Sequence, residues 1–200
     1  MTRSLMRKVV VIEHVTLDGV IQAPGRADED ERGGFDHGGW GHARSDEVME
    51  RKMGEGMAKE GSLLLGRRTY EDFLSFWPRQ TDNPYTEVLD NTEKYVASNT
   101  LREPLPWQNS KLLSGDAAAV VAELKQQRGG DFGVLGSGML VRSLMQRSLV
   151  DEFVLMIHPL VLGTGRRLFP DGGPLAELRL VDSVTTTTGV VIATYEASGR

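Results

Sequence analysis

Two glycine-containing turns hold the residues of this sequence that are best suited to binding a phosphate. In Leu63–Thr69 an apolar run ends at Gly66 and two arginines follow, and in Phe132–Leu140 an apolar run passes through the Gly-x-Gly turn Gly136–Gly138. A helix that begins after such a turn presents unpaired backbone N–H groups to an anion, and arginine binds phosphate in a bidentate manner. Most isolated Gly-x-Gly turns are only tight corners, and the arginines have the alternative of simple solvation. Two such turns, each after an apolar run, favour a phosphate-bearing ligand.

A third segment, Val15–Gln22, follows the first apolar run of the chain. Asp18 in it is expected to brace the Asp-Gly turn, since aspartate side chains bond to nearby backbone N–H groups. Val20 and Ile21 offer an apolar edge to a flat ring. Glu13 ends the apolar run itself, where burial raises the pKa of a carboxyl group and suits it to proton donation. The alternative is that Glu13 points outward or pairs with an arginine.

Several other chemistries are disfavoured. The chain has no cysteine, so thiolate metal sites, disulfides and cysteine nucleophiles are excluded. His37 and His42, five residues apart on a glycine-rich stretch, are poor candidates for a metal site. Ser137 lies directly between two glycines, which is not the spacing of a hydrolase nucleophile elbow.

The bulk composition describes a globular chain of 200 residues with 40 % hydrophobic and 26 % charged residues. Its net charge of -5 disfavours a nucleic-acid partner. No apolar stretch has the length of a transmembrane helix or of a signal-peptide core, so we expect no membrane association and a cytoplasmic protein.

The apolar patterns predict alternating strands and helices that position these residues. Strands are expected at 9–12, 63–65, 95–97, 112–113, 132–135, 152–158, 179–187 and 190–195. Helices are expected from Ser45 to 57, and at 69–76, 116–127 and 139–146. This order predicts an α/β fold with a mostly parallel central sheet and an antiparallel C-terminal hairpin that turns at Gly189. We expect one domain over 1–200.

A long turn-rich segment between Asp18 and Gly41 lacks any such pattern. Loops of this length in a compact domain are usually functional or disordered, and the aromatic residues Phe35 and Trp40 argue against disorder. We expect its part from Gln22 to Trp40 either to cover the substrate as a lid or to form a dimer interface.

The three segments, taken in the order 15–22, 63–69 and 132–140 in which they occur along the chain, give the sequence a resemblance to the dihydrofolate-reductase-like superfamily. The motifs are Thr-Leu-Asp-Gly, Leu-Leu-Gly-Arg-Arg-Thr-Tyr, Val-Ala-Ser-x-Thr-Leu, Gly-x-Gly-x-Leu and Leu-Val-Asp-Glu followed by His-Pro-x-Val-Leu-Gly. The chain is most similar to the branch that contains the C-terminal reductase domain of the bifunctional riboflavin-biosynthesis deaminase/reductase. The likeness covers about residues 7 to 197 and implies a three-layer α/β/α fold.

The resemblance implies an NADPH-dependent oxidoreductase, and a homodimer. Carried over to this sequence, it assigns the cofactor to Val20, Ile21 and Gln22 at the nicotinamide, Ser98 and Thr100 near the 2′-phosphate, Gly66, Arg67, Arg68 and Thr69 at phosphates, and Gly136, Ser137, Gly138, Met139 and Leu140 at the pyrophosphate. Phe35, Trp40, Tyr70 and Phe73 are the candidate walls of the substrate site.

Two departures from the resemblance concern the substrate. Folate reductases use an acidic residue of the first helix to hold the pterin, and the nearest candidate here, Asp46, is displaced by one position; helix capping or solvation is the alternative for it. The riboflavin enzymes carry a lysine where this chain has Ile12, so the ribosyl-phosphate substrate does not follow. We therefore expect hydride transfer to a small heterocycle or carbonyl, with Glu13, Asp46 or water as proton donor. The other possibilities are a dihydrofolate-type reductase and a nucleotide-binding module without turnover.

Overall fold

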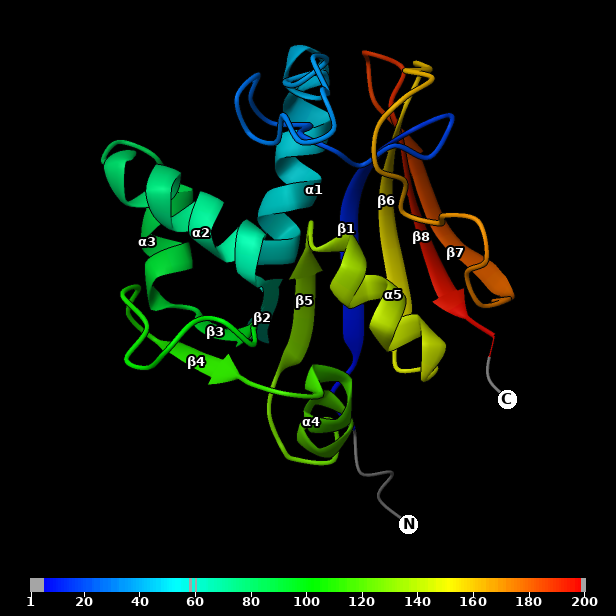
Figure 1. The fold of residues 1–200 in the computed structure, drawn as a ribbon. Coiled ribbons are helices and arrows are strands. Elements are labelled where there is room, and N and C mark those ends of the chain that lie inside the picture. Colours follow the sequence, from blue (N-terminus) through cyan, green and yellow to red (C-terminus); the bar gives the residue numbers. More distant parts are fainter. Residues whose placement is uncertain (1–5, 58, 60, 199–200) are drawn as a thin grey trace. The chain divides into compact units, whose positions relative to one another are not determined.

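The computed structural model of the chain (Figure 1) describes residues 6–57, 59 and 61–198. These residues fall into two compact units. The first unit comprises Met1–Val10 and Lys59–Val150, and the second comprises Val11–Ala58 and Asp151–Arg200.

The first unit is built on parallel strands. Strands β2 (Gly61–Gly66), β3 (Glu93–Ala97), β4 (Ser110–Leu113) and β5 (Asp131–Leu135) lie in the order β4-β3-β2-β5, and each neighbouring pair is parallel. The helices are α2 (Arg67–Phe76), α3 (Pro84–Asn91), α4 (Ala117–Leu124) and α5 (Gly138–Gln146), with the 3₁₀ turn η2 (Trp77–Arg79) after α2. Leu64 pairs with both Tyr95 and Val134, which puts a continuous apolar core along the strands. Parallel strands of this kind are covered on both faces, which accounts for the apolar runs Leu63–Leu65 in β2 and Tyr95–Ala97 in β3.

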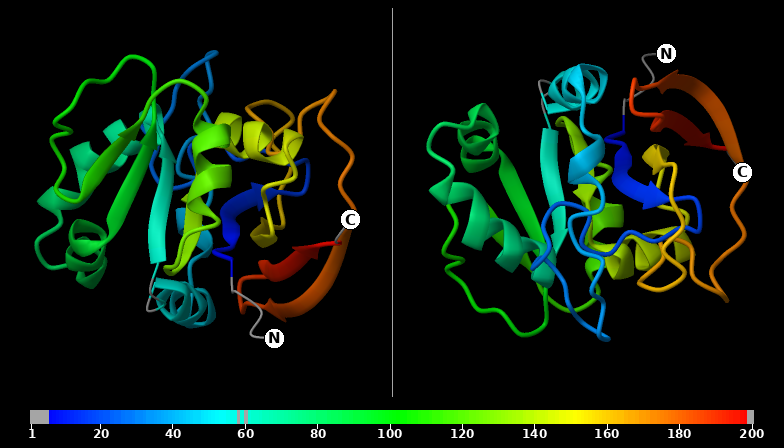
Figure 2. Two further views of the ribbon diagram at one scale, coloured as in Figure 1. Left: turned by 90° about the horizontal axis from the view of Figure 1, so that it is seen from below. Right: turned by 90° about the horizontal axis from the view of Figure 1, so that it is seen from above.

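The second unit is antiparallel at its C-terminal end. It holds most of β1 (Val9–Thr16), the 3₁₀ turn η1 (His42–Arg44), α1 (Glu47–Met57), β6 (Glu152–His158), β7 (Leu178–Thr185) and β8 (Val191–Ala197). Strand β8 pairs antiparallel with both β6 and β7, and Figure 2 shows β7 and β8 as two long curved strands side by side. Met49 of α1 packs against Met156, Val190 and Ile192, so this methionine has the role of core packing.

The predicted fold class is confirmed: the fold is mixed α/β, with mostly parallel pairing and an antiparallel C-terminal hairpin. The hairpin turns at Gly189, whose φ of 83° lies in the left-handed region that glycine favours. Within the described part of the chain, no helix is long and apolar enough to cross a membrane.

Two helical details differ from the prediction. The cap of α1 is Asp46 and not Ser45, because the Asp46 carboxylate accepts the N–H of Met49 at 2.9 Å. Helix α3 was not predicted. Its N-terminus carries the combination of Asn83, whose side chain accepts the N–H of Tyr85, with Pro84 at the first helical position. Such a pair is a standard helix start, so the signal was present in the sequence.

Candidate functional site

The candidate phosphate-binding turns lie at the carboxyl ends of two neighbouring strands of the first unit. Strand β2 runs directly into α2, and β5 runs through Gly136 and Ser137 into α5. Because β2 and β5 are parallel neighbours, their carboxyl ends lie at the same edge of the sheet. The N-termini of α2 and α5 therefore meet there. Each carries the partial positive charge of a helix N-terminus, which favours an anion.

Ser137 joins the two turns. Its Oγ accepts a hydrogen bond from the backbone N–H of Gly66 at 2.9 Å, and it lies 3.0 Å from both Thr69 Oγ1 and the carbonyl oxygen of Leu135. A serine at this position would normally cap its own helix, but Ser137 makes no side-chain bond to α5. The hydroxyl therefore fixes the spacing between the two helix N-termini.

The turn before α5 is held in an unusual backbone conformation. Gly136 and Ser137 have φ of 55° and 63°, both in the left-handed region. For Ser137 this costs roughly 1–2 kcal/mol, and such strain persists where the surrounding structure requires it. A side chain at Gly136 would meet Thr69, with its Cβ 3.2 Å from Oγ1. Glycine is thus needed here for the close approach of the two turns.

The first turn of α5 is open to a ligand. Among the described residues, no hydrogen bond is found for the N–H of Gly138 or of Met139. The side chain of Met139 is 84 % exposed, an uncommon state for a large apolar residue, whereas Leu140 is buried. The free N–H groups fit a pyrophosphate, and Met139 supplies apolar surface beside them.

The arginines of α2 supply positive charge at this edge. Arg67 lies 3.8 Å from Glu71 on its own helix, with its side chain 39 % exposed. Arg68 is exposed, and the structure gives it no partner among the described residues. Both guanidinium groups are therefore accessible from solvent, as a phosphate contact requires.

Ser98 and Thr100 follow β3, the other parallel neighbour of β2. The hydroxyl of Ser98 accepts the N–H groups of Thr100 and Leu101, each at 3.1 Å. This closes a tight turn at the carboxyl end of β3, with Thr100 exposed. The first unit therefore brings Gly66–Thr69, Ser98–Thr100 and Gly136–Leu140 to one edge of its sheet.

Val20, Ile21 and Gln22 belong to the second unit, and two of their three side chains are used inside it. Val20 is fully buried and packs with Ala23, Phe35 and Trp40. Gln22 is also buried. Its side-chain NH₂ group donates to the backbone carbonyl oxygens of Asp30 and Arg32, and its Oε1 accepts the backbone N–H of Arg166. Ile21 alone keeps a partly exposed side chain. A flat ring beside this segment would meet Ile21 and the backbone.

The interpretation of Asp18 as a brace agrees with the structure. Its carboxylate accepts the hydroxyl of Thr16 at 2.6 Å and the N–H groups of Leu162 and Gly163 at 3.2 and 2.8 Å. The hydrogen bond from Thr16 is the main reason why the pKa of Asp18 lies below its ordinary value. Asp18 thus fastens the loop after β6 to the turn after β1.

Asp46 makes the contacts of its alternative role, helix capping, and its role as proton donor stays a prediction. One carboxylate oxygen caps α1, and the other accepts the N–H and the hydroxyl of Thr187 at 2.6 and 2.7 Å. The hydrogen bond from Thr187 is the largest of several that lower the pKa of Asp46. A carboxylate held ionised in this way is a poor acid at neutral pH. Glu13 is 3 % exposed, on the face of β1 that carries Val11 and Val15, and its role as proton donor stays a prediction.

Three of the four candidate substrate walls are buried in the structure, and their contact with a substrate stays a prediction. Tyr70 is 1 % exposed, and its hydroxyl accepts the N–H of Trp107 at 3.0 Å. Phe35 and Trp40 are buried with Val20, and Trp40 Nε1 donates to the carbonyl oxygen of Gln22 at 2.7 Å. Phe73 is half-buried, with its ring centroid 6.4 Å from that of Trp77.

A buried histidine pair in the second unit was missed by the sequence reasoning. His14 Nδ1 and His158 Nε2 are 2.8 Å apart, and the indole of Trp40 lies edge-on to His158 with centroids 5.1 Å apart. Burial lowers the pKa of each histidine to about 4, and for His158 the neighbouring His14 and Arg44 act in the same direction. Both rings are therefore neutral at pH 7. In the part of the chain that the structure describes, no group of three or more potential metal ligands is found.

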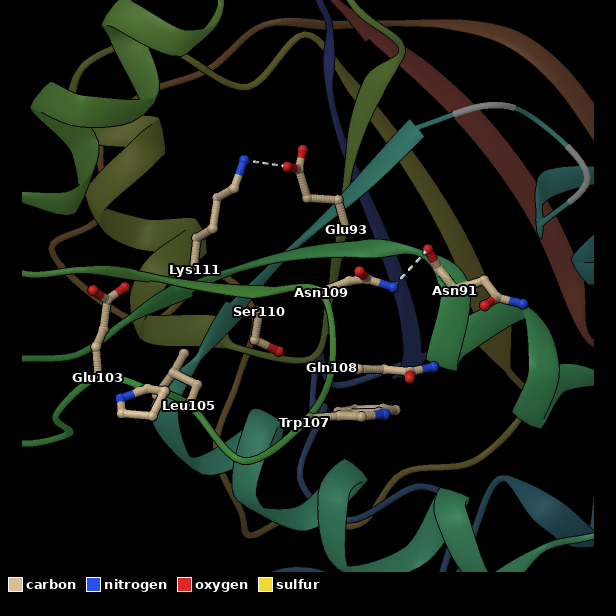
Figure 3. Close-up of a pocket in the computed structure, with 10 residues that line it drawn as sticks. Asn91, Glu93, Glu103, Leu105, Trp107, Gln108, Asn109, Ser110 and Lys111 are labelled. Carbon is tan, nitrogen blue, oxygen red and sulfur yellow. Dashed lines mark hydrogen bonds and ion pairs between the residues drawn. The ribbon is translucent and has the colours of Figure 1, made fainter.

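A cavity of about 620 Å³ lies elsewhere in the first unit (Figure 3). It is lined by Asn91, Glu93, Glu103, Pro104, Leu105, Trp107, Gln108, Asn109, Ser110 and Lys111. Glu93 and Ser110 are the first residues of β3 and β4, so the cavity is at the amino ends of these strands. The candidate phosphate site is at the carboxyl ends, and the two are therefore separate.

Comparison with known proteins identifies the family of the chain. The family model of the RibD C-terminal domain matches residues 7–192. The uncharacterized protein YyaP of Bacillus subtilis (strain 168) is 30 % identical over 208 residues, covering 100 % of both chains.

Two solved structures share the fold. A protein of Shewanella sp. PV-4 whose name refers to riboflavin biosynthesis superposes with a TM-score of 0.73 at 24 % identity, covering 96 % of this chain and 99 % of that one. Dihydrofolate reductase from Enterococcus faecalis, solved with NADP(H), gives a TM-score of 0.60 at 14 % identity, covering 98 % and 99 %. The chain has the dihydrofolate-reductase-like fold and belongs to the RibD C-terminal domain family, a family of reductases.

Proposed function

We propose that this protein is a cytoplasmic NADPH-dependent reductase of the riboflavin-biosynthesis type, which transfers a hydride to a C=N or C=O group of a small heterocycle or carbonyl compound. The observation that carries the proposal is the link between Ser137 and Gly66, which holds two helix N-termini together at the carboxyl edge of parallel strands. Ligands of α/β sheets bind at this edge. The family supports reduction, and the accessible arginines support a phosphate-rich cofactor.

The residues present fit NADPH. The N–H groups of Gly138 and Met139, which bond to none of the described residues, would hold its pyrophosphate, and the guanidinium groups of Arg67 and Arg68 would bind its 2′-phosphate. When bound, the cofactor supplies the hydride, and the protein supplies position and electrostatics. The turn of Ser98 and Thr100 would lie along the adenosine end.

Nucleotide titration tests the cofactor assignment. Quenching of tryptophan fluorescence should show tighter binding of NADPH than of NADH. Arg67→Ala or Arg68→Ala should weaken NADPH binding by about 1.5–3 kcal/mol, the value of a charge-assisted hydrogen bond, and barely affect NADH. Arg79→Ala, on an exposed arginine of η2, is the matched control. Equal affinities for the two nucleotides would refute a 2′-phosphate site.

A substrate screen tests the reaction. NADPH oxidation is followed with pterins, ribityl-pyrimidines and small carbonyl compounds. Turnover with one class identifies the substrate, and reduction of dihydrofolate itself would favour a folate reductase. NADPH binding without turnover by any of them would favour the nucleotide-binding module over the enzyme.

A further inference from the structure

The hydrogen bond between His14 and His158 leaves one ring nitrogen of each histidine outside the pair. His158 is fully buried, and its Nδ1 has no hydrogen-bond partner among the described residues. His14 is only partly buried. No hydrogen bond is found from its Nε2 to any described residue. Unlike His158 Nδ1, this nitrogen is not a fully buried atom without a partner. His158 Nδ1 is therefore the sealed end of the pair, and His14 Nε2, which belongs to a partly exposed residue and bonds to none of the described residues, is here called its open end.

Burial of His158 decides the tautomers. A neutral imidazole carries one N–H and one acceptor nitrogen. If His158 carried its proton on Nδ1, a buried N–H donor would have no acceptor, and such orphaned donors are rare in proteins. If the proton is on Nε2, it is donated to His14 Nδ1, and only an acceptor is left unsatisfied on His158 Nδ1. The second arrangement places the proton of His14 on Nε2, at the open end.

Burial also keeps the pair neutral. Arg44 is the charged group identified beside His158, and its positive charge opposes protonation, as burial does. Among the residues that the structure describes, no carboxylate is identified as acting on the pKa of either histidine. At neutral pH the open end therefore presents a fixed, uncharged N–H donor. A neutral imidazole with a lowered pKa is suited to polarising a carbonyl group.

The open end lies on the same side of β1 as the turn that leads to Val20. His14 and Thr16 are two residues apart on a strand, so their side chains share a face. Thr16 Oγ1 accepts the N–H of Val20 at 2.9 Å, and Thr16 N–H donates to the carbonyl oxygen of Val20 at 3.0 Å. From the other side, Trp40 packs on His158 and bonds to Gln22. The histidine pair is thus built into the support of the 20–22 segment.

We infer that His14 Nε2–H donates a hydrogen bond to a carbonyl oxygen or ring nitrogen of the substrate, and that His158 is the positioning residue that holds His14 in this tautomer. The inference rests on the proposed function, because the family resemblance assigns the nicotinamide to Val20–Gln22. The inference names the chemical class of the substrate: beside its reacting carbon the substrate carries an uncharged hydrogen-bond acceptor. It does not need a carboxylate at this position.

Nuclear magnetic resonance tests the tautomers without any turnover. Two-bond ¹H–¹⁵N correlation spectra of the ¹⁵N-labelled protein at pH 7 should show His14 and His158 both as neutral Nε2–H tautomers. Assignment comes from loss of signals in His14→Gln and His158→Phe. A proton on Nδ1 of either ring, or a charged ring at pH 7, would overturn the inference even if the protein binds no cofactor.

Kinetics test the contact with substrate. His14→Leu should lower kcat for hydride transfer at least tenfold while NADPH affinity stays within twofold. His14→Gln, whose amide can donate, should recover part of the loss. His158→Phe should lower kcat less than His14→Leu and give a mixture of His14 tautomers in the ¹⁵N spectra, because His14 loses the partner that fixes its tautomer. His42→Ala, on an exposed histidine, is the control.

The two failures are distinguishable. A wild-type protein that oxidises NADPH while His14→Leu turns over normally refutes the role of His14 and leaves the proposed function standing. A wild-type protein that neither binds nor oxidises NADPH refutes the proposed function. In that case the substrate contact falls with it, whatever the tautomers are.

Discussion

The hydroxyl of Ser137 accepts the backbone N–H of Gly66, 71 residues earlier in the chain, at 2.9 Å. This hydrogen bond joins the start of α5 to the start of α2, and it forms because β2 and β5 are parallel neighbours whose carboxyl ends coincide. Ser137 pays for the contact with a left-handed backbone. Backbone strain of this kind is typical of functional sites. The strained backbone and the long-range hydrogen bond of Ser137 therefore favour a role in shaping a ligand site over a role in helix stability alone.

Replacing Ser137 separates the hydrogen bond from the backbone strain. Ser137→Ala should destabilise the protein by about 1–2 kcal/mol, because the N–H of Gly66 loses its acceptor. Ser137→Gly loses the same acceptor but relieves about 1 kcal/mol of left-handed strain, so its free energy of unfolding should be closer to that of the wild type. Urea denaturation measures both. NADPH affinity should fall equally in the two variants, and an affinity that tracks stability instead would contradict a positioning role.

Gly136 should be less tolerant of a side chain than other glycines with positive φ. Gly136→Ala incurs the cost of a left-handed alanine, about 1–2 kcal/mol, and also brings a Cβ to 3.2 Å from Thr69 Oγ1. Gly115→Ala is the matched control, since Gly115 has φ of 75° with nothing within 4 Å of its Cβ position. Unfolding free energies of the two variants should differ by about 1 kcal/mol, as expected for overpacking. Equal losses would show that Thr69 yields without cost.

The turns at Gly66 and Gly136 could be predicted because their signals are local. An apolar run, a glycine and a helix start lie within a few residues, and strand periodicity then brings them to one edge. Likewise Glu152–His158 and the hairpin at Gly189 follow from pattern and turn chemistry.

Contacts between distant residues could not be predicted in this way. His14 and His158 are 144 residues apart, and nothing in their local sequences indicates a shared hydrogen bond. The resemblance to folate reductases makes Asp46 a candidate for chemistry, and its contact with Thr187, 141 residues away, has no signal in the local sequence. The burial of Phe35, Trp40 and Tyr70 follows from packing, whereas the sequence only indicates that aromatic side chains are available.

The histidine pair should make stability fall in mildly acidic solution. Because burial lowers the pKa of His158 from 6.5 to about 4, its contribution is fully present above pH 6.5 and is lost as the pH falls toward 4. For this one group the loss between pH 7 and pH 5 is about 2 kcal/mol. His14 titrates with it, so the two contributions are not additive.

Urea denaturation at pH 7 and pH 5 checks this. The drop in unfolding free energy should be clear in the wild type and in the control His42→Asn, and smaller in His158→Phe, in which only His14 keeps a pKa lowered by burial. A His158→Phe protein that loses as much stability between pH 7 and pH 5 as the wild type would assign the pH dependence to other groups.

Asp46 should matter for stability and not for turnover. Asp46→Ala removes the cap of α1 and the acceptor for Thr187, so the Tm should fall. Asp46→Asn keeps one acceptor oxygen and should lose less. Because the pKa of Asp46 is lowered, this stabilisation is present at neutral pH and is lost only as the pH falls below the ordinary carboxyl range. Calorimetry measures the Tm, and kcat per folded protein should be unchanged; a large drop in kcat for Asp46→Asn would restore its catalytic assignment.

The segment between Asp18 and Gly41 should behave as a packed structure and not as a freely moving lid. Trp40 is 8 % exposed, packs with Val20, Ala23 and Phe35, and donates to the carbonyl oxygen of Gln22. Trp40→Ala should therefore cost about 3–5 kcal/mol, as for other large-to-small changes in a core. Trp40→Phe keeps most of the apolar contact and loses the hydrogen bond, so it should cost less.

Hydrogen exchange and mass measurements on the same samples separate the alternatives for this segment. If the packing is intact, backbone amides such as that of Gly39, which donates to Ala23, should be protected in the wild type and exposed in Trp40→Ala. Because the Trp40 side chain packs within its own unit, the number of subunits per particle, measured as mass in solution, should be the same for Trp40→Phe as for the wild type. A wild-type dimer that dissociates in Trp40→Phe, with NADPH oxidation per folded subunit unchanged, would instead make the segment an interface between two copies of the chain.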